Sequence, residues 1–189
     1  FVNDGSGRFE EMTEASGLGS NSGATTMALA DVDMDGDLDL YVTNNKTRSA
    51  KDIYSINERT FEKTTRRTEQ GWEILPEFRD HYTLNVKGDF LERFEYAEPD
   101  FLYINDGSGK FQRERLTEGR FRDGTGAIIE EEFSDWGLTA RFQDFDQDGD
   151  PDIYVCNDFE SPDRIWINDG TGNFQLLPTL SLRNTSASS

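Results

Sequence analysis

Short stretches of alternating hydrophobic and polar residues run along most of the chain, and glycine-rich turns separate them. Residues 81–96 alternate around Gly88-Asp89, and residues 152–156 alternate as Asp-Ile-Tyr-Val-Cys. A period of two is typical of β-strands with one buried face. The charged stretch 58–70 fits a short helix or an ordered loop. The pattern therefore predicts an all-β, antiparallel protein.

One turn motif occurs three times, each time between an apolar strand end and a phenylalanine. The three copies are Asn3-Asp4-Gly5-Ser6-Gly7, Asn105-Asp106-Gly107-Ser108-Gly109 and Asn168-Asp169-Gly170-Thr171-Gly172. Asn, Asp and Gly tolerate positive φ at a tight reversal, so each copy predicts a β-hairpin. We expect Asp4, Asp106 and Asp169 to form these turns rather than to bind metal.

A second, acidic motif occurs twice, between the hairpins, and runs directly into a strand. We call residues 31–39 the first acidic loop and residues 144–152 the second acidic loop. Both follow the pattern Asp-x-Asp-x-Asp-Gly-Asp-x-Asp and continue as Leu/Ile-Tyr-Val. The repeating order is hairpin, acidic loop, hairpin, acidic loop, hairpin, which predicts about two repeat units.

The repeat spacing is uneven, because Asn3 and Asn105 are farther apart in the chain than Asn105 and Asn168. We therefore expect one repeat domain over 1–189 whose first unit carries an insertion containing an extra hairpin. The expected parts are the first hairpin and loop (1–45), the insertion (46–99), the second hairpin, second loop and third hairpin (100–174), and a polar C-terminal segment (175–189).

The charge balance limits the partners. With 38 acidic and 19 basic residues the formal net charge is −19, which opposes binding to nucleic acid or to an anionic membrane surface. No stretch approaches the ~20 apolar residues of a membrane span. The single Cys156 is expected in a buried strand, and the single His81 leaves little room for a zinc site or a catalytic triad.

The acidic loops contain the candidate metal ligands. Calcium prefers six to eight oxygen ligands, and aspartates at alternate positions can direct carboxylates to one point while glycine allows the bend. The expected ligands are Asp31, Asp33, Asp35, Asp37 and Asp39 in one loop, and Asp144, Asp146, Asp148, Asp150 and Asp152 in the other. We therefore predict two Ca²⁺ sites. Magnesium suits these loops less well, because it retains more of its water.

The position of the last carboxylate separates the kinds of calcium loop. An EF-hand needs an acidic residue at position 12 and flanking helices, but position 12 is Val42 in one loop and Val155 in the other. Dockerin-type and thrombospondin-type loops are disfavoured for the same reason. A strand–loop–strand site that ends at Asp39 or Asp152 remains.

The two motifs together resemble the FG-GAP/VCBS repeat family, including integrin α chains and cartilage acidic protein-like secreted proteins. The run 156–164 and the segment near Pro99-Asp100 resemble the bacterial cartilage acidic protein-like branch. This resemblance implies β-propeller blades with calcium in their loops. Because a propeller needs at least four blades, we expect either part of a longer propeller or an open array. The repeat pattern also begins and ends partway through a unit.

Other residues are weaker candidates. A further metal or partner site is conceivable at four residues after the second loop: Asn157, Asp158, Glu160 and Asp163. We expect recurring aromatic residues to pack between sheets: Phe9, Phe111, Phe174, Tyr41, Tyr154, Trp136 and Trp166. Trp72 is a weak candidate for a sugar-binding platform.

These observations predict a non-catalytic, calcium-binding structural or adhesion module outside the cell. Its expected partners are other copies of itself, the remainder of a longer repeat protein, or an extracellular protein or glycan. Two alternatives remain, a subunit of a self-assembling calcium-stabilised filament and a calcium-dependent polysaccharide-active enzyme. The sequence favours no enzyme, because its clustered carboxylates are accounted for as metal ligands.

Overall fold

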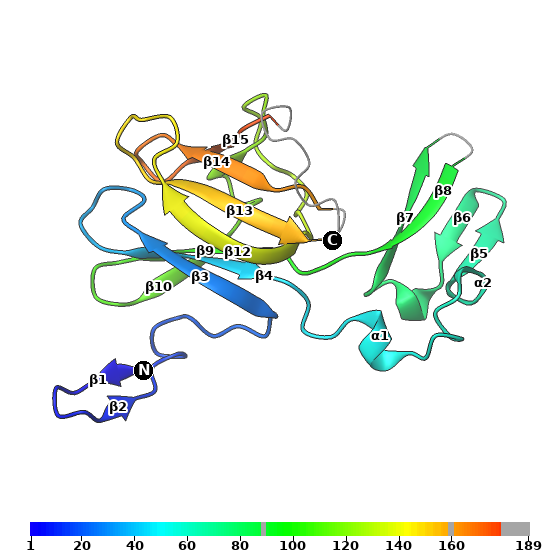
Figure 1. The fold of residues 1–189 in the computed structure, drawn as a ribbon, viewed down its shortest axis with the longest axis horizontal. Coiled ribbons are helices and arrows are strands. Elements are labelled where there is room, and N and C mark those ends of the chain that lie inside the picture. The colour runs from blue at the N-terminus through cyan, green and yellow to red at the C-terminus, as the bar shows by residue number, and fades with distance from the viewer. Residues whose placement is uncertain (88–89, 159–160, 179–189) are drawn as a thin grey trace.

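The fold consists almost entirely of antiparallel β-sheets (Figure 1). We describe it from a computed structural model that covers residues 1–87, 90–158 and 161–178. The predicted all-β fold class is confirmed, and among these residues the sheets do not close into a barrel. In the part of the chain that the structure describes, no helix is long and apolar enough to cross a membrane.

Two similar sheets form the body of the molecule. The first has the order β10-β9-β4-β3. Its strands are β3 (Ala24–Ala30), β4 (Asp39–Asn44), β9 (Phe101–Asn105) and β10 (Phe111–Arg115). The second has the order β11-β15-β14-β13-β12. Its strands are β11 (Phe121–Arg122), β12 (Trp136–Gln143), β13 (Asp152–Asp158), β14 (Arg164–Asn168) and β15 (Phe174–Leu176).

Each sheet is a four-stranded antiparallel meander, as in a propeller blade. The acidic loop joins the first two strands, and the Asn-Asp-Gly turn joins the last two. β11 adds to the second sheet in parallel with β15. Because β15 extends to Leu176, the third hairpin continues two residues past the expected boundary at 174. Of the polar segment predicted at 175–189, residues 179–189 lie outside the described residues.

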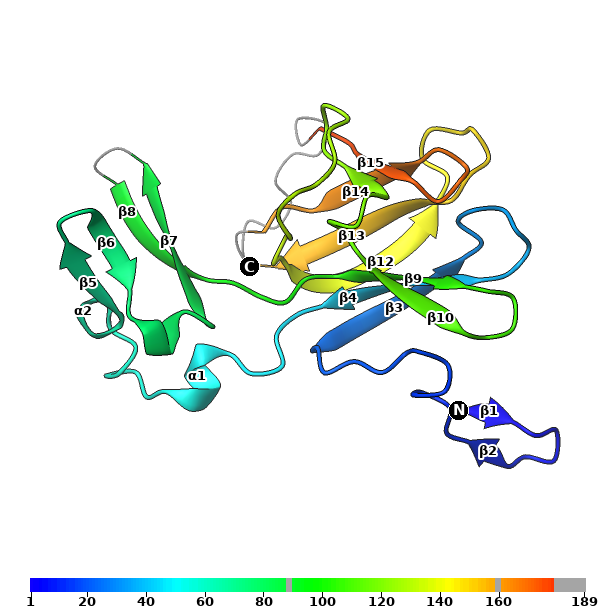
Figure 2. The same ribbon diagram turned by 180° about the vertical axis from the view of Figure 1, so that it is seen from behind.

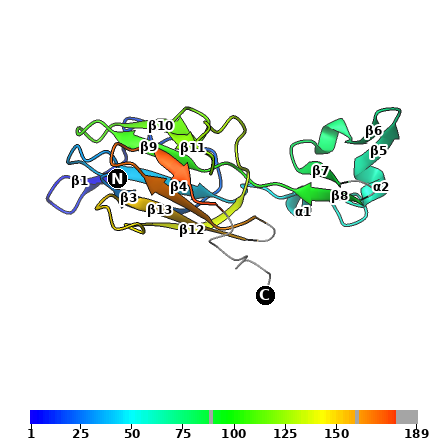
Figure 3. The ribbon, with the colours of Figure 1, turned by 90° about the horizontal axis from the view of Figure 1, so that it is seen from above.

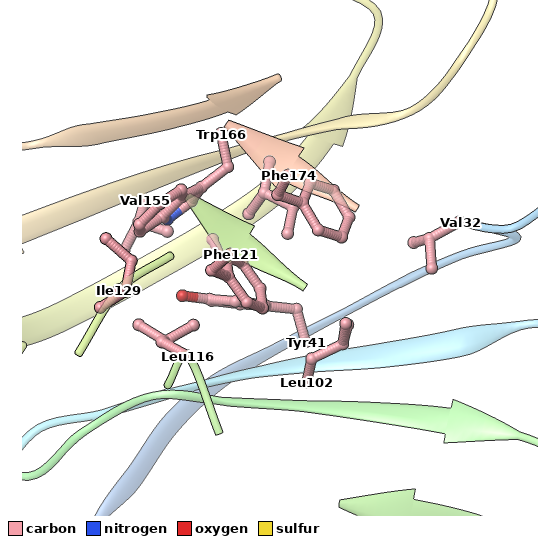
Figure 4. Packing of buried hydrophobic residues seen from close by; sticks show 11 residues of the cluster. Val32, Tyr41, Leu102, Leu116, Phe121, Ile129, Val155, Trp166 and Phe174 are labelled. Atoms are coloured by element: carbon pink, nitrogen blue, oxygen red, sulfur yellow. The ribbon is translucent and has the colours of Figure 1, made fainter. Parts of the chain in front are cut away.

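The main core lies between the two sheets (Figure 4). Trp166 has no exposed surface, and its ring meets that of Phe121 edge to face at 5.0 Å. Phe121 stacks on Phe174 at 5.1 Å. Tyr41 and Leu102 reach this cluster from the first sheet. Burying each such side chain contributes about 1.5–3 kcal/mol, so this core holds the two sheets together.

β4 is buried on both faces, which explains its continuous apolar run. Tyr41 faces the core between the sheets, whereas Leu40 and Val42 belong to a second cluster with Phe101 and Tyr103. The partly buried Leu18 and Phe111 complete that second cluster. The strand that follows the first acidic loop therefore reads as near-continuous hydrophobic sequence rather than as strict alternation.

Of the aromatic residues expected to pack between the sheets, Tyr41, Trp166 and Phe174 do so, whereas Phe111 packs against the second cluster and Tyr154 and Trp136 are half-buried outside both clusters. Cys156 lies in strand β13 as predicted but is only half-buried. The prediction is wrong for Phe9. Phe9 is 64% exposed because it lies in the small N-terminal hairpin of β1 (Val2–Asn3) and β2 (Phe9–Glu10), which pair only with each other. Figure 1 shows this hairpin set apart from the two sheets, and Figure 3 shows it at the end of the molecule opposite the insertion.

One polar closure recurs at the far end of the second strand of each sheet. In the first, Asp100 accepts hydrogen bonds from Tyr41 Oη (2.9 Å) and from the backbone N–H of Asn44 (2.8 Å). In the second, Asp163 does the same for Tyr154 Oη (2.8 Å) and Asn157 N–H (3.0 Å). Both asparagine amides also donate to a proline carbonyl, that of Pro99 or Pro162.

At this closure the chain leaves the first sheet to form the insertion and later returns to the sheet. The asparagine and proline are separated by residues 45–98 in the first sheet and only by 158–161 in the second. The same hydrogen bonds seal both connections, so the blade geometry is independent of the connection's length. Figures 1 and 2 show the insertion projecting from the end of the sheets opposite the acidic loops.

The insertion contains two hairpins, where one was predicted. The expected hairpin at 81–96 is formed by β7 (Tyr82–Lys87) and β8 (Phe90–Glu95). The stretch 58–70 contains α2 (Phe61–Thr64) and β5 (Thr65–Thr68), and β5 pairs with β6 (Gly71–Ile74). α1 (Ala50–Ile53) comes before these elements in the chain, and the 3₁₀ helix Pro76–Phe78 joins β6 to β7. Charged Arg66-Arg67 hid the alternation of β5, since both side chains face solvent.

A small separate core supports the insertion. Ala50, Ile74, Phe78 and Tyr82 are buried together, and His81 is buried beside them, with its ring 5.7 Å from that of Tyr54. Burial lowers the pKa of His81. The side chain is therefore a neutral packing residue of the insertion.

The buried carboxyl of Asp100 predicts a pH-dependent stability. Burial raises its pKa to about 7, although the hydrogen bonds from Asn44 and Tyr41 oppose the rise. Because the folded pKa exceeds the unfolded one, the stabilisation is complete below about pH 4 and is lost as the pH rises through 7. Relative to the wild type, Asp100→Asn should therefore gain about 2.5 kcal/mol of unfolding free energy between pH 5 and pH 8. Urea denaturation at both pH values measures this, and parallel pH profiles would contradict it.

Candidate metal centres

The two acidic loops lie at the same end of the sheets (Figure 2). The first connects β3 to β4 and the second connects β12 to β13. The Asn-Asp-Gly turns, between β9 and β10 and between β14 and β15, lie at this end too. Each loop is therefore flanked by the hairpin turn of its own sheet.

Three carboxylates converge in each loop, from positions 1, 3 and 9 of the motif. Asp31, Asp33 and Asp39 place one carboxylate oxygen each within 4.8 Å of one another. Asp144, Asp146 and Asp152 do the same in the second loop. In both groups the position-9 aspartate is buried, but the other two are half-buried in the first loop and exposed in the second. The two groups have the same arrangement in different surroundings.

The position-1 aspartate shapes the bend of each loop. Asp31 accepts hydrogen bonds from the backbone N–H groups of Asp35 and Gly36, both at 3.1 Å. Asp144 accepts from Gln147 (2.6 Å) and Gly149 (3.1 Å). These bonds fold the loop back over its own first residue, which brings the first and third carboxylates together.

Left-handed backbone completes the bend. The position-6 glycines Gly36 and Gly149 have φ of 99° and 104°, as the motif predicted. Position 4 is also left-handed, with φ of 61° at Met34 and 67° at Gln147. Non-glycine residues rarely adopt this conformation, and the sequence alone gave no sign of it at these two positions.

The position-9 aspartate ties each loop to the neighbouring hairpin. Asp39 accepts from Val32 N–H (3.0 Å) with one oxygen and from Asn105 N–H (2.9 Å) with the other. Asp152 accepts from the N–H groups of Phe145 (2.7 Å) and Asn168 (2.8 Å). The buried carboxylate therefore joins the start of the loop, the end of the loop and the Asn-Asp-Gly turn.

Positions 5 and 7 lie outside the converging groups. Asp35 and Asp148 each accept a hydrogen bond from the backbone N–H two residues later. Asp37 and Asp150 reach toward the hairpin turn, where a Cβ added to Gly107 would lie 3.1 Å from Asp37 Oδ2. That these four residues bind metal stays a prediction.

The electrostatics of the loops oppose a metal-free state. Burial, followed by neighbouring carboxylates, raises the pKa of Asp37 and of Asp150. Burial raises the pKa of Asp39, and partial desolvation in the loop raises that of the exposed Asp146. Asp33 Oδ1 and Asp37 Oδ1 are buried and accept no hydrogen bond. Unpartnered carboxylate oxygens gathered in one loop fit a hard divalent cation, which needs oxygen ligands and offsets their charge.

The three Asn-Asp-Gly turns have the structural role predicted for them. Asp4 Oδ1 accepts from the N–H (2.8 Å) and hydroxyl (2.7 Å) of Ser6, and Asp106 and Asp169 make the same bonds. These bonds lower the pKa of Asp4 and Asp106.

A fourth copy of this turn was missed. Asp123 Oδ1 accepts from the N–H (2.8 Å) and hydroxyl (2.7 Å) of Thr125 and from Ala127 N–H (3.0 Å). The sequence Asp-Gly-Thr-Gly at 123–126 matches the motif, but Arg122 replaces the leading asparagine and Ile128 replaces the final phenylalanine. A search for the Asp-Gly-Ser/Thr-Gly core alone would have found it.

Two of the weaker candidates have a structural role. Asn157 and Asp163 close the connection between β13 and β14, as described above. Neither they nor Asp158 belong to a converging metal-type group among the described residues, and Glu160 lies outside those residues. Trp72 is 41% exposed, with its ring against that of Phe61 at 5.3 Å.

Comparison with known proteins gives one family. Residues 1–42 and 144–189 match the model of the FG-GAP-like repeat. These segments contain both acidic loops and the first and third of the Asn-Asp-Gly turns. No curated protein and no solved structure matches the chain.

Because the Asn-Asp-Gly turn contacts the acidic loop, we predict that replacing different turn glycines with alanine lowers stability by different amounts. Gly107, Gly109 and Gly170 all have φ between 76° and 80°. An added Cβ would meet nothing at Gly109 but would overlap Asp150 Oδ2 at Gly170. Gly109→Ala should therefore cost only the left-handed strain of about 1–2 kcal/mol, and Gly170→Ala should cost more because Asp150 must move. Denaturation curves of both variants test this order, which equal losses would refute.

Proposed function

Since this chain contains two regions of FG-GAP-like repeat, we propose that both acidic loops bind calcium and that the chain is a non-catalytic, calcium-stabilised extracellular module. The observation that carries the proposal is the convergence of three carboxylates in each loop, Asp31/Asp33/Asp39 and Asp144/Asp146/Asp152. The unpartnered oxygens of Asp33 and Asp37 support it.

Calcium would act by removing a repulsion that the fold creates. Two like charges ~5 Å apart at an effective dielectric of ~20 repel by about 3 kcal/mol, and each loop holds several such pairs. With a cation bound between the carboxylates, the electrostatic energy of the loop becomes attractive instead of repulsive. It also holds the position-9 aspartate in place, and with it the hairpin turn that this aspartate anchors. The ion therefore stiffens the blade rather than a single loop.

An extracellular setting suits such sites. FG-GAP-like repeats are typical of extracellular or surface proteins, and extracellular calcium modules bind with Kd of ~10⁻⁴ to 10⁻³ M. At calcium concentrations ten times Kd, each site adds about 1.4 kcal/mol to the unfolding free energy. Millimolar calcium outside the cell would supply this stabilisation.

The rival enzymatic function has less support. Catalytic acid–base pairs need a carboxylate or histidine that can reach a substrate, but His81 is buried, and Asp31 and Asp144 accept the hydrogen bonds that shape the loops. A turnover screen on acidic polysaccharides separates the two functions, since activity that depends on Asp33 or Asp146 would favour the enzyme.

We predict that the wild type binds two calcium ions. Replacing Asp33 or Asp146 with Asn removes one oxygen charge from a converging group, so each variant should bind a single ion. Isothermal titration calorimetry in calcium-free buffer counts the ions. The variant Asp123→Asn is the control, because Asp123 lies in a hairpin turn outside both groups, and it should still bind two.

The same binding must appear as stability. Excess chelator should lower the melting temperature of the wild type, and the loss should be smaller in each single-loop variant. A wild type that binds no calcium at millimolar concentration, or melts at one temperature with and without it, rules out the proposed function.

Association with further blades is the partner interaction that the fold supports best. β3, which is the edge strand of the first sheet, exposes Met27 (64%) and Leu29 (57%), and the N-terminal hairpin exposes Val2 and Phe9. Exposed apolar residues on an edge strand favour pairing with another chain or segment. We expect calcium-dependent association, because bound calcium offsets part of the −19 charge. Sedimentation with and without calcium tests this, and a monomer under both conditions contradicts it.

A further inference from the structure

We infer that the two calcium loops bind cooperatively and that Asn168 couples them across the sheets. This inference rests on the proposed function. It concerns how the two sites communicate, through a residue that lies outside both converging groups.

A continuous hydrogen-bonded path joins the two groups. In the first sheet, Asp39 Oδ2 accepts from Val32 N–H at 3.0 Å. The carbonyl of the same Val32 accepts from Asn168 Nδ2 of the second sheet at 2.8 Å. The backbone N–H of Asn168 donates to Asp152 Oδ1 at 2.8 Å. A ligand-position aspartate of one loop is therefore linked to that of the other by two intervening residues.

Every member of this path is withdrawn from solvent. Val32, Asp39, Asp152 and Asn168 are each no more than 2% exposed. Bonds in such surroundings are not exchanged for bonds to water, so breaking one leaves a buried polar group unsatisfied. Val32 also packs in the core between the sheets, which fixes its peptide from the apolar side (Figure 4).

Asn168 is itself held in one orientation. Its Oδ1 accepts from the N–H groups of Gly170 and Gly172, both at 3.2 Å, and its Nδ2 also donates to Pro151 O at 3.2 Å. A Cβ added to Gly172 would lie 3.3 Å from Asp33 Cβ. The turn of the second sheet therefore rests directly on the first acidic loop.

The path favours positive coupling. Calcium in the second loop holds Asp152, which fixes the Asn168 amide against Val32. This orders the peptide that positions Asp39 before the first ion arrives. The second ion then meets a loop that is already ordered, and loses less conformational entropy on binding. By reciprocity, filling the first loop must favour the second by the same factor.

Long-range charge works in the opposite direction. Filling one acidic loop weakens the negative field at the other, which favours negative coupling. At 0.15 M salt the Debye length is ≈ 8 Å, so this opposing effect is screened while the buried hydrogen bonds are not. Raising KCl from 0.02 to 0.15 M should therefore increase the measured coupling factor, and this salt dependence separates the two effects.

The first sheet supplies a matched control. Asn105 occupies the equivalent place, and its N–H donates to Asp39 Oδ1 at 2.9 Å. Its Nδ2 donates to Leu38 O of the same sheet at 3.2 Å, whereas that of Asn168 reaches the neighbouring sheet. Both Asn105→Ser and Asn168→Ser remove the bond from Nδ2 to the loop and the bond from the last turn glycine to Oδ1. Asn168→Ser also removes the bond from Gly170 N–H, and it alone removes the bond to Val32.

Calcium titrations of the intact chain test the inference. Asp146→Asn leaves the first loop alone, and Asp33→Asn leaves the second. If the loops were independent, the wild-type isotherm would be the sum of these two. We expect instead that the wild type binds its ions at least about fivefold more tightly than that sum predicts, the lower end of ordinary coupling. A wild-type isotherm equal to the sum overturns the coupling.

The role of Asn168 is tested in the same way. In Asn168→Ser the isotherm should become the sum of those of its two single-loop variants. Asn105→Ser should weaken the first site yet keep the coupling. Coupling that persists in Asn168→Ser, or is lost equally in Asn105→Ser, overturns the assignment. Absence of all calcium binding would instead refute the proposed function. The comparison of wild type with single-loop variants requires no change at Asn168, so it stands even if that variant unfolds.

Discussion

Asp39 and Asp152 each place a carboxylate in the interior, and the blade-like units are organised around those two groups. Neither is more than 1% exposed, and each accepts backbone N–H groups from its own loop and from the adjacent hairpin. A buried charge is tolerated only when it is hydrogen-bonded or paired. The loop, the strand after it and the Asn-Asp-Gly turn must therefore keep one relative geometry, and that geometry brings the carboxylates of positions 1 and 3 close to that of position 9.

A second polar closure frees the other end of each unit to vary. Asp100 and Asp163 accept hydrogen bonds from equivalent groups, the tyrosine hydroxyl and the asparagine N–H of their own sheet. Because these bonds seal the connection locally, the first unit accommodates an insertion with its own small core. The acidic loops and the insertion lie at opposite ends of the sheets (Figure 1). The candidate metal sites therefore lie apart from the insertion, which only the first unit has.

The two units differ in what covers them, although their motifs match residue for residue at the ligand positions. The turn of the second sheet rests on the first loop, so Asp31 and Asp33 are half-buried while Asp144 and Asp146 are exposed. In an array of such units each loop would be covered by the next. The bond from Asn168 to Val32 shows how covering one loop also connects it to its neighbour.

The sequence by itself determined the repeat, the strands and the position of both acidic loops, because period-two alternation, Asn-Asp-Gly turns and the spacing of aspartates are local signals. It did not reveal β5, whose arginines face solvent, or the Asp123 turn, whose flanking residues differ. It also misplaced Phe9, since burial depends on what packs against a hairpin. Only the tertiary structure decided which three aspartates converge and that Asn168 reaches the other sheet. The first depends on the bend of each loop, with Met34 and Gln147 in left-handed conformation, which their residue types do not signal. The second joins residues 136 positions apart, and local pattern carries no information about such a contact.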